Sequence, residues 1–221
     1  DWKKIFEGAE WFHFTGITPA LSDNCIEITL DALKAAKEAG VTISVDLNYR
    51  KKLWSREKAG KVMSELVKYC DVLIANEEDA EMVFGIKAEK TDITEGKLSD
   101  EGYMAVAKEL YDRFNLKYVA ITLRESYSAS VNGWSGMLYD GKNYYKSKKY
   151  DIYIVDRVGG GDSFCGGLIY GLSSGMDNQT ALEFATAASC LKHTIEGDFN
   201  MMTVDEVMTL VKGDASGRVQ R

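Results

Sequence analysis

The fold of this chain is indicated most clearly by one stretch, Asp156-Arg157-Val158-Gly159-Gly160-Gly161-Asp162-Ser163-Phe164, which stands between an apolar segment and a helical one. Glycines adopt backbone conformations that other residues avoid, and they let N–H groups approach a ligand without an intervening Cβ. A glycine loop that opens a helix presents unpaired N–H donors and the positive end of the helix dipole, and both attract anions. The stretch therefore predicts a site for a phosphate-sized anion between a strand and a helix.

Asp162 adds chemistry to this loop. Phosphoryl transfer needs alignment, stabilisation of charge, and a base that accepts the proton of the attacking hydroxyl group. A carboxylate beside an anion site meets the last two needs. The alternative is that Asp162 only caps the following helix, as aspartate commonly does. The loop is not a P-loop, because GxxxxGK[ST] is absent, and it lacks the GxGxxG spacing of a dinucleotide-binding fold.

Before this stretch, the chain alternates between apolar and amphipathic segments. Short β-branched segments predict strands at residues 41–47, 71–75 and 118–123. Helical periodicity predicts helices at residues 22–39, 55–69, 77–84 and 100–114. Ser22 is the expected N-cap of the first helix, and Gly40 is its expected end. This alternation is typical of parallel βαβ units with helices on both faces of a sheet, so the predicted fold class is α/β.

The pattern changes after the third predicted strand. Residues 128–155 are rich in tyrosine and are interrupted by Asn132-Gly133 and Asp140-Gly141. Both dipeptides favour type I′ turns, so antiparallel hairpins that extend the sheet are expected here. Further helices are predicted near residues 163–174, 178–194 and 204–211. No repeat, low-complexity tract or linker interrupts the chain, which predicts one domain over residues 1–221.

Composition and charge exclude several classes of function. The 221 residues are 45% apolar and 28% charged, as in soluble globular proteins. The net charge of −7 argues against a nucleic-acid partner, which would require a basic face. No apolar stretch approaches the roughly 20 residues that span a bilayer, and no leader sequence opens the chain. The scattered Cys25, Cys70, Cys165 and Cys190 form neither a zinc motif nor a disulfide framework, so we expect a cytoplasmic protein without a membrane partner.

Residues 156–164 resemble the DTxGAGDxF signature of the ribokinase, or PfkB-type, sugar kinases, with Arg157-Val158 and Gly160 as departures from it. The resemblance implies a three-layer ribokinase-like fold in which helices flank a mainly parallel sheet. It also implies ATP and Mg²⁺ as cofactors. In that family the backbone of Gly159, Gly160 and Gly161 would form an anion hole for the charge that develops on the γ-phosphate. Asp162 would be the base that deprotonates the sugar hydroxyl group.

A second segment, Asn76-Glu77-Glu78-Asp79, resembles the NxxE motif that organises Mg²⁺ and its waters in this family. Its last position is Asp79 rather than glutamate, which leaves open whether Asp79 or Glu78 acts through water on the metal. The resemblance also implies that Asn76 lies near the nucleotide. The alternative is a solvated acidic helix N-terminus that the helix dipole stabilises.

Two further segments resemble the family's nucleotide site. Thr122-Leu123-Arg124-Glu125 is similar to its T-x-G-x-x-G motif, with Arg124 in place of a glycine, so that Arg124 is either a phosphate contact or a surface charge. Residues 187–194 resemble the helix that forms one wall of the adenine pocket, which implies contacts from Ala188 and Lys192. Small residues there equally permit close helix packing. Gly197 is expected to end this helix beside the nucleotide, and His193 is expected to be packed or at the surface.

Residues 45–54, VDLNYRKKLW, follow a predicted strand and should lie at the carboxyl edge of the sheet, where ligands bind. Asp46, Asn48 and Arg50 could hydrogen-bond a polyol, and the guanidinium group could pair with a carboxylate. In the alternative, Arg50 forms an ion pair with Asp46. The pattern D-x-N-x-R-x-x-L-W resembles family members that act on 2-keto-3-deoxygluconate and fructose. Together with the tail at residues 217–221, the chain resembles the 2-keto-3-deoxygluconate kinases most, with fructokinases as the near alternative.

The resemblance covers essentially the whole chain, yet members of the family are usually longer. We therefore expect the chain to be the C-terminal two-thirds of the fold, without the N-terminal strands and the lid. The resemblance implies a sugar acid and ATP as small-molecule partners and a homo-oligomer for the full-length protein. A hypothesis from another class is a nucleotide-binding fragment without turnover.

Overall fold

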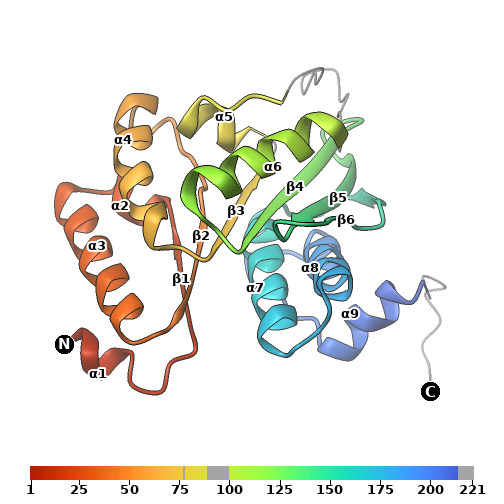
Figure 1. The fold of residues 1–221 in the computed structure, drawn as a ribbon. Coiled ribbons are helices and arrows are strands. Elements are labelled where there is room, and N and C mark those ends of the chain that lie inside the picture. The colour runs from red at the N-terminus through yellow and green to blue at the C-terminus, as the bar shows by residue number, and fades with distance from the viewer. Residues whose placement is uncertain (77, 89–99, 214–221) are drawn as a thin grey trace. The chain divides into compact units, whose positions relative to one another are not determined.

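The computed structural model describes residues 1–76, 78–88 and 100–213. Two compact units can be distinguished (Figure 1). The first comprises Asp1–Thr122 and Leu138–Tyr144, and the second comprises Leu123–Met137 and the described residues from Tyr145 onward. The expectation of a single domain over residues 1–221 stays a prediction, and each unit is described by itself.

The first unit is built on parallel strands in the order β1-β2-β3-β4. They are β1 (Trp11–Thr15), β2 (Thr42–Asp46), β3 (Val72–Asn76) and the beginning of β4 (Tyr118–Ser126). Their β-branched and leucine side chains are almost fully buried, as expected for a parallel sheet that is covered by helices. The register aligns Thr15 with Asp46 and Asn76 with Thr122, so polar residues from neighbouring strands meet at the carboxyl edge.

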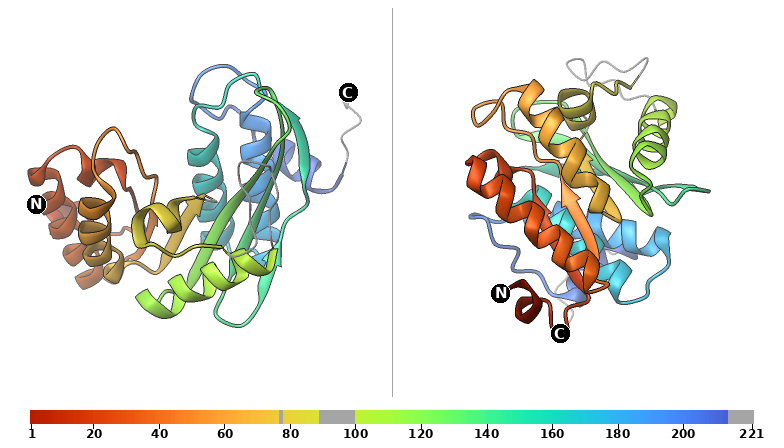
Figure 2. Two further views of the ribbon diagram at one scale, coloured as in Figure 1. Left: turned by 90° about the horizontal axis from the view of Figure 1, so that it is seen from above. Right: turned by 60° about the vertical axis from the view of Figure 1, so that its left-hand side comes forward.

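The helices of this unit are α1 (Trp2–Ile5), α2 (Ile17–Ala20), α3 (Asp23–Glu38), α4 (Arg56–Leu66), the 3₁₀ helix η1 (Val67–Tyr69), α5 (Asp79–Phe84) and α6 (Asp100–Phe114). The Ser22 hydroxyl group caps α3 by accepting from the Cys25 amide at 3.1 Å, which confirms the predicted N-cap. Gly40 follows α3 with a φ of +72°, as its predicted role as a stop requires. Helices α3 and α4 lie side by side (Figure 2).

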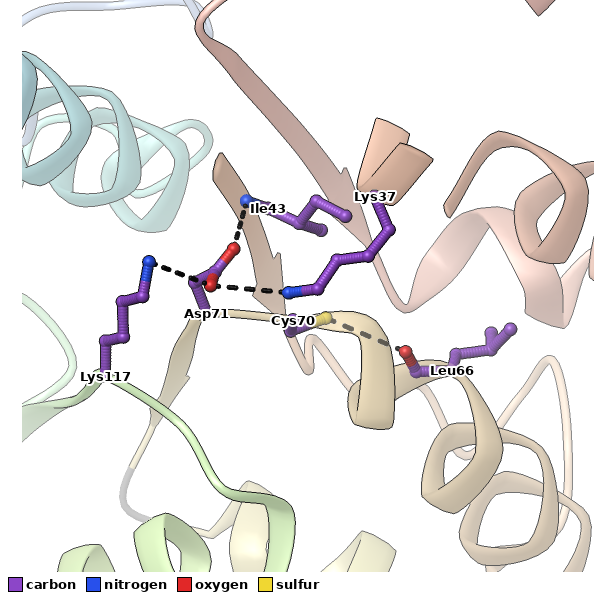
Figure 3. A network of polar contacts seen from close by, with 6 residues as sticks. All are labelled: Lys37, Ile43, Leu66, Cys70, Asp71 and Lys117. Atoms are coloured by element: carbon purple, nitrogen blue, oxygen red, sulfur yellow. Dashed lines mark hydrogen bonds and ion pairs between the residues drawn. The ribbon is translucent and has the colours of Figure 1, made fainter. Parts of the chain in front are cut away.

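A buried carboxylate ties three segments of this unit together (Figure 3). The side chain of Asp71 is only 10% exposed; it accepts from the Ile43 amide at 2.9 Å and forms ion pairs with Lys37 at 3.4 Å and Lys117 at 3.2 Å. Burial opposes ionisation of this carboxyl group, but the amide and the two ammonium groups hold its pKa below the ordinary value. Asp71 therefore fixes the start of β3 against its neighbours.

The second unit contains the end of β4, most of β5 (Val131–Tyr139) and of β6 (Tyr144–Lys146), and β7 (Tyr150–Tyr153). Strand β5 lies between β4 and β6 in the strand order, and its first residues pair with β7. This last pairing is antiparallel, with Val131 opposite Tyr153, which confirms the predicted change from parallel to antiparallel structure.

The two predicted type I′ turns are wrong. Asn132-Gly133 lies inside β5, where the hydroxyl end of the Tyr127 side chain lies against Gly133. A turn does form at Asp140-Gly141, where the Asp140 carboxylate accepts from the backbone amides of Lys142 and Asn143. Asp140 has a negative φ, whereas a type I′ turn needs positive values at both central positions.

The remaining helices are α7 (Gly160–Ser173), α8 (Asn178–Lys192) and α9 (Val204–Val211). Helix α7 begins three residues before its predicted start, so Gly160, Gly161 and Asp162 form its first turn. Helices α7 and α8 pack side by side (Figure 1), and the approach is close because a Cβ on Gly167 or Gly171 would lie 2.8 Å from the backbone of α8. In the part of the chain that the structure describes, no helix has the length and apolar character needed to cross a membrane.

Candidate active site

Asp162 lies in the first turn of α7 with its side chain exposed to solvent. It makes no hydrogen bond or ion pair with any residue that the structure describes. The residue at the N-cap is Gly159, with a φ of +80°, and no side chain caps the helix. The alternative in which Asp162 serves as a cap is therefore wrong, and its carboxylate is available to a ligand.

The backbone amides around Asp162 divide into two kinds. The Gly160 amide donates to the Arg157 carbonyl at 3.3 Å, and the Ser163 amide donates to the Gly159 carbonyl at 2.8 Å. The amides of Gly159, Gly161 and Asp162 have no partner within the described residues. Unpaired amides at a helix N-terminus attract negative charge. Of the three predicted anion-hole glycines, two thus have open amides, whereas Gly160 uses its amide within the loop.

The C-terminal end of α8 holds the glycine loop in place. The Ser189 hydroxyl group donates to the Gly160 carbonyl at 2.7 Å. The carbonyl of His193 accepts from the amides of Val155 and Asp156 at 2.8 and 3.3 Å. Three residues around the loop, Val155, Asp156 and Gly160, are thereby joined to one helix end, so the conformation of the loop depends on the end of α8.

Asp156 links the glycine loop to the segment that follows α8. Its carboxylate accepts from the amides of Val158 and Gly197, each at 3.0 Å, and these two bonds hold its pKa below the ordinary value. Gly197 has a φ of +83°, in a conformation that favours glycine. The Gly197 amide is thus engaged by the protein itself. The prediction that Gly197 ends the helix is wrong, because α8 ends at Lys192 with His193 as its C-cap.

The predicted nucleotide contacts lie in different surroundings. Lys192 is fully buried, and its ammonium group donates to the Ile195 carbonyl at 3.3 Å. Ala188 is buried on α8, and Arg124 is half-buried on β4. Burial lowers the pKa of His193, and the positive charges of Lys192, Arg157 and Arg124 act in the same direction. Cationic groups therefore gather near the end of α8.

A cleft of about 390 Å³ opens beside Asp162 in the second unit. Helix α7 contributes Asp162, Ser163 and Tyr170, and α8 contributes Phe184 and Ala188. The opposite side is the loop before α9, with Asp198, Phe199, Asn200, Met202 and Thr203. This loop was not predicted as part of a site, since nothing in its composition distinguishes it from an ordinary connection. The cleft is large enough for part of a small ligand next to the carboxylate.

In the first unit, polar groups gather where β1 and β2 end. The Asn48 side chain donates to the Thr15 hydroxyl oxygen at 3.0 Å, and the Asn48 amide donates to Asp46 at 3.1 Å. Asn48 has a positive φ of 40°, a conformation that asparagine tolerates better than most residues. The structure thus brings together the predicted Asp46 and Asn48 and adds Thr15. The position of Thr15 at the end of an apolar segment was the signal that could have identified it.

Arg50 is exposed, and its guanidinium group donates to the Tyr49 carbonyl at 3.1 Å. Burial raises the pKa of Asp79, and the positive charge of Arg50 acts to lower it. The alternative of an Arg50–Asp46 pair stays a prediction. Arg50 lines a cavity of about 510 Å³ together with Tyr49, Lys51, Lys52, Arg56, Glu78 and Met82. Four basic side chains in one cavity favour an anionic ligand. The tail at residues 217–221, the other feature that indicated the sugar, lies outside the described residues.

The side chains of Asn76 and Asp79 in the NxxE-like motif form hydrogen bonds with backbone amides of the protein. The Asn76 side-chain oxygen accepts from the amides of Glu78 at 2.8 Å and Asp79 at 3.0 Å. Asp79 is 3% exposed, and its two oxygens accept from the amides of Tyr49 and Asn76. Burial raises the pKa of Asp79 despite these two bonds. The alternative of a solvated acidic terminus is therefore wrong for Asp79.

Glu78 differs from its neighbour, because it is exposed and its carboxylate has no partner among the described residues. Glu77 lies outside the described residues. The Thr122 hydroxyl group is buried and donates to the Ala75 carbonyl at 3.5 Å. Nowhere in the described ranges do three His, Cys, Asp or Glu side chains converge as metal ligands.

Comparison with known proteins adds a family to this geometry. The model of the pfkB family carbohydrate kinases matches residues 1–203. The 2-dehydro-3-deoxygalactonokinase of Haloferax volcanii is 33% identical over 213 residues, which are 96% of this chain and 60% of that protein. Fructokinase-2 of Solanum lycopersicum is 29% identical over an alignment that covers 96% of this chain and 60% of that protein. The chain thus spans about 60% of the length of these relatives.

A solved structure agrees with the family match. The 2-dehydro-3-deoxygluconokinase of Thermotoga maritima superposes with a TM-score of 0.91 at 53% sequence identity, over 96% of this chain and 64% of that one. The predicted ribokinase-like α/β fold, with helices flanking a mostly parallel sheet, is confirmed, and the chain is partial relative to these proteins.

Proposed function

This chain belongs to the pfkB family of carbohydrate kinases, and on that basis we propose that the intact protein transfers the γ-phosphoryl group of ATP to a hydroxyl group of 2-keto-3-deoxygluconate. The observation that carries the proposal is the first turn of α7, where an exposed, unpaired carboxylate stands beside amides without partners. The identity of 53% to the Thermotoga 2-dehydro-3-deoxygluconokinase supports the choice of sugar.

Asp162 is the proposed base. Its carboxylate accepts the proton of the sugar hydroxyl group while that oxygen attacks the phosphorus atom. The amides of Gly159, Gly161 and Asp162 receive the negative charge that develops on the transferring group, assisted by the helix dipole. Gly160 contributes through its backbone conformation, because its own amide is engaged by Arg157.

The residues present fit ATP with Mg²⁺. Mg²⁺ usually keeps several waters and is held by one or two carboxylates together with phosphate groups, so a protein cage of three ligands is not needed. When bound, it neutralises charge on the phosphate groups. Glu78 is the carboxylate available to its waters, whereas Asp79 holds Asn76 and Tyr49 in position.

The residues that the sequence proposed as nucleotide contacts fall into two groups, those that can contact the nucleotide directly and those whose polar groups are used within the protein. Lys192 and Arg124 provide positive charge for the phosphate groups, and Ala188 provides a small wall for the flat base. Asn76 and Thr122 in the first unit, and Gly197 in the second, each use a polar group in a hydrogen bond within the protein, so their proposed contacts with the nucleotide would use their remaining atoms.

Arg50 favours an acidic sugar. A charge-assisted pair with the sugar carboxylate is the contact that fructose cannot make, and the neighbouring Lys51, Lys52 and Arg56 add to the positive potential. Asp46 and Asn48 lie at the end of β2, where they would bind sugar hydroxyl groups. The proposed partners are thus a sugar acid and ATP.

Three wider expectations are proposals as well. The family match extends across both compact units, which supports a single kinase domain. All four cysteines are free thiols, and three are buried, which suits the reducing cytoplasm. The intact protein is proposed to be a homo-oligomer.

The test is a coupled assay of ADP release by the intact protein with 2-keto-3-deoxygluconate, fructose, ribose and adenosine. The expected kcat/KM for the acid exceeds that for fructose by roughly tenfold or more, since a charge-assisted hydrogen bond contributes about 1.5–3 kcal/mol. Arg50→Gln should remove this preference and leave turnover of fructose in place. Equal use of fructose by the unaltered enzyme would favour the fructokinase alternative.

A non-catalytic nucleotide-binding module is the candidate from another class, and it is favoured by the partial coverage of the relatives. Calorimetry with ATP, together with the assay of ADP release, separates the kinase from the non-catalytic module. Binding of ATP without ADP release on any of the four sugars would support the module and contradict the kinase.

A further inference from the structure

The imidazole ring of His193 lies directly against Gly160. A Cβ built on Gly160 would lie 2.6 Å from Nε2 of the ring and closer still to Cε1. Side-chain carbons do not approach other heavy atoms that closely, so even alanine at position 160 requires the ring or the loop to move. Gly161, the next residue, has nothing within 4 Å of the same built atom. The restriction is therefore specific to one position of the loop.

The ring of His193 is itself held in place. It is 4% exposed, and its Nδ1 lies 2.7 Å from the Ser189 carbonyl. A carbonyl group can only accept, so Nδ1 carries the proton of this bond. The Trp134 ring packs against the imidazole with a centroid distance of 4.9 Å. A ring fixed on two sides resists displacement toward the interior.

The backbone of Gly160 is held as well, because its carbonyl accepts from the Ser189 hydroxyl group at 2.7 Å. Gly160 is thus in contact with Ser189 of α8 and with His193, the C-cap of that helix, and the next two residues, Gly161 and Asp162, carry the open amides. Any shift of Gly160 moves those amides and the Asp162 carboxylate with it. The contact with His193 therefore determines where the first turn of α7 presents its donors.

We propose that His193 is a positioning residue, matched in size to Gly160, whose ring sets the location of the phosphoryl-binding amides at the start of α7. Its role in turnover rests on the proposed function of those amides, whereas its role in the conformation of the loop does not. The sequence alone gave no sign of it, because the contact joins residues far apart in the chain.

The test is a pair of substitutions and their combination in the intact protein. Gly160→Ala forces a methyl group against the ring and should lower kcat by about 10²-fold, the loss seen when one donor to a transition-state anion is removed. KM for the sugar should change less than about threefold, since only transition-state binding is affected. Adding His193→Ala makes room for the methyl group and should recover roughly tenfold or more of the lost kcat.

Gly161→Ala is the matched control. It lies one residue away with open space around its built Cβ, so its effect on kcat should combine additively with that of His193→Ala. Recovery in the Gly160 pair together with additivity in the Gly161 pair supports the proposal. A Gly160→Ala enzyme with normal kcat overturns it, and so does a double variant with no recovery.

Thermal unfolding separates this inference from the proposed function. Gly160→Ala should lower the Tm, and His193→Ala should relieve part of that loss, even if no sugar is phosphorylated. If Gly160→Ala does not fold, His193→Ala is compared with the double variant, and the added methyl group should then lower kcat less than about threefold. A larger loss in that comparison contradicts the steric match.

Discussion

The aspartates in the first turns of α5 and α7 use their carboxylates differently. Asp79 on α5 is 3% exposed, and both of its oxygens accept from backbone amides. Asp162 on α7 is exposed and has no partner among the described residues. A buried, fully bonded carboxylate holds the fold together, whereas an unpaired one beside open amides can take up a proton and a ligand. The comparison shows that the bonds around an acidic residue, more than its place in a motif, indicate chemistry.

The largest expected effect comes from removing the unpaired carboxylate. Asp162→Ala should lower kcat by about 10²–10⁴-fold, the usual contribution of a general base. The free energy of unfolding should change by less than about 0.5 kcal/mol, because the Asp162 carboxylate has no hydrogen-bond or ion-pair partner among the described residues. Kinetics of ADP release and denaturant unfolding measure the two quantities on the same preparation. Turnover that stays near normal would contradict the assignment of the base.

The bonded carboxylate should show the reverse pattern. Asp79→Ala leaves the amides of Tyr49 and Asn76 without their acceptor, which should lower the free energy of unfolding by about 1–3 kcal/mol. At a temperature where the variant remains folded, kcat should fall far less than in Asp162→Ala. A fully stable Asp79→Ala protein with severely reduced kcat would show that Asp79 takes part in the reaction.

A third aspartate, Asp71, adds a test through the pH dependence of the unfolding free energy, and the expected change is smaller than for Asp79→Ala. Because its pKa is lowered in the folded protein, its stabilisation is present above the ordinary aspartate pKa of about 3.9 and is lost as the pH falls through the folded value. Asp71→Asn should therefore cost about 1 kcal/mol of unfolding free energy at pH 7, and the cost should shrink below about pH 4. Urea unfolding at several pH values measures it, and a constant difference would contradict the network.

The sign is opposite for Asp79. Burial raises its pKa, so its contribution to stability is greatest below the ordinary aspartate pKa and is lost as the pH rises through the folded value. The same urea series on Asp79→Ala should therefore show a larger cost of the substitution in acid than at neutral pH.

Local signals in the sequence predicted much of the fold. Helix α6 spans Asp100–Phe114 and α9 spans Val204–Val211, as apolar periodicity indicated, and Ser22 caps α3 as its position suggested. These features depend on residues close together in the chain, which is why sequence alone revealed them.

Features that depend on distant residues were missed or misread. Gly133 looked like a turn residue, but it lies inside β5 with the Tyr127 side chain against it. Thr15 and His193 acquire their partners, Asn48 and Gly160, only through the fold. The glycine loop and Asp162 were identified as a candidate site, whereas the engagement of the Gly160 amide and the burial of Asp79 became visible only in three dimensions.

The central claim is that the first turn of α7 keeps its amides open for the transferring phosphoryl group. The most direct measurement is an NMR titration of the intact, ¹⁵N-glycine-labelled protein with ADP, Mg²⁺ and aluminium fluoride, an analogue of that group, in the presence of the sugar. The account predicts a large shift of the Gly161 amide resonance and a small one for Gly160, whose amide already donates to Arg157. An unchanged Gly161 resonance at saturating ligand would contradict it.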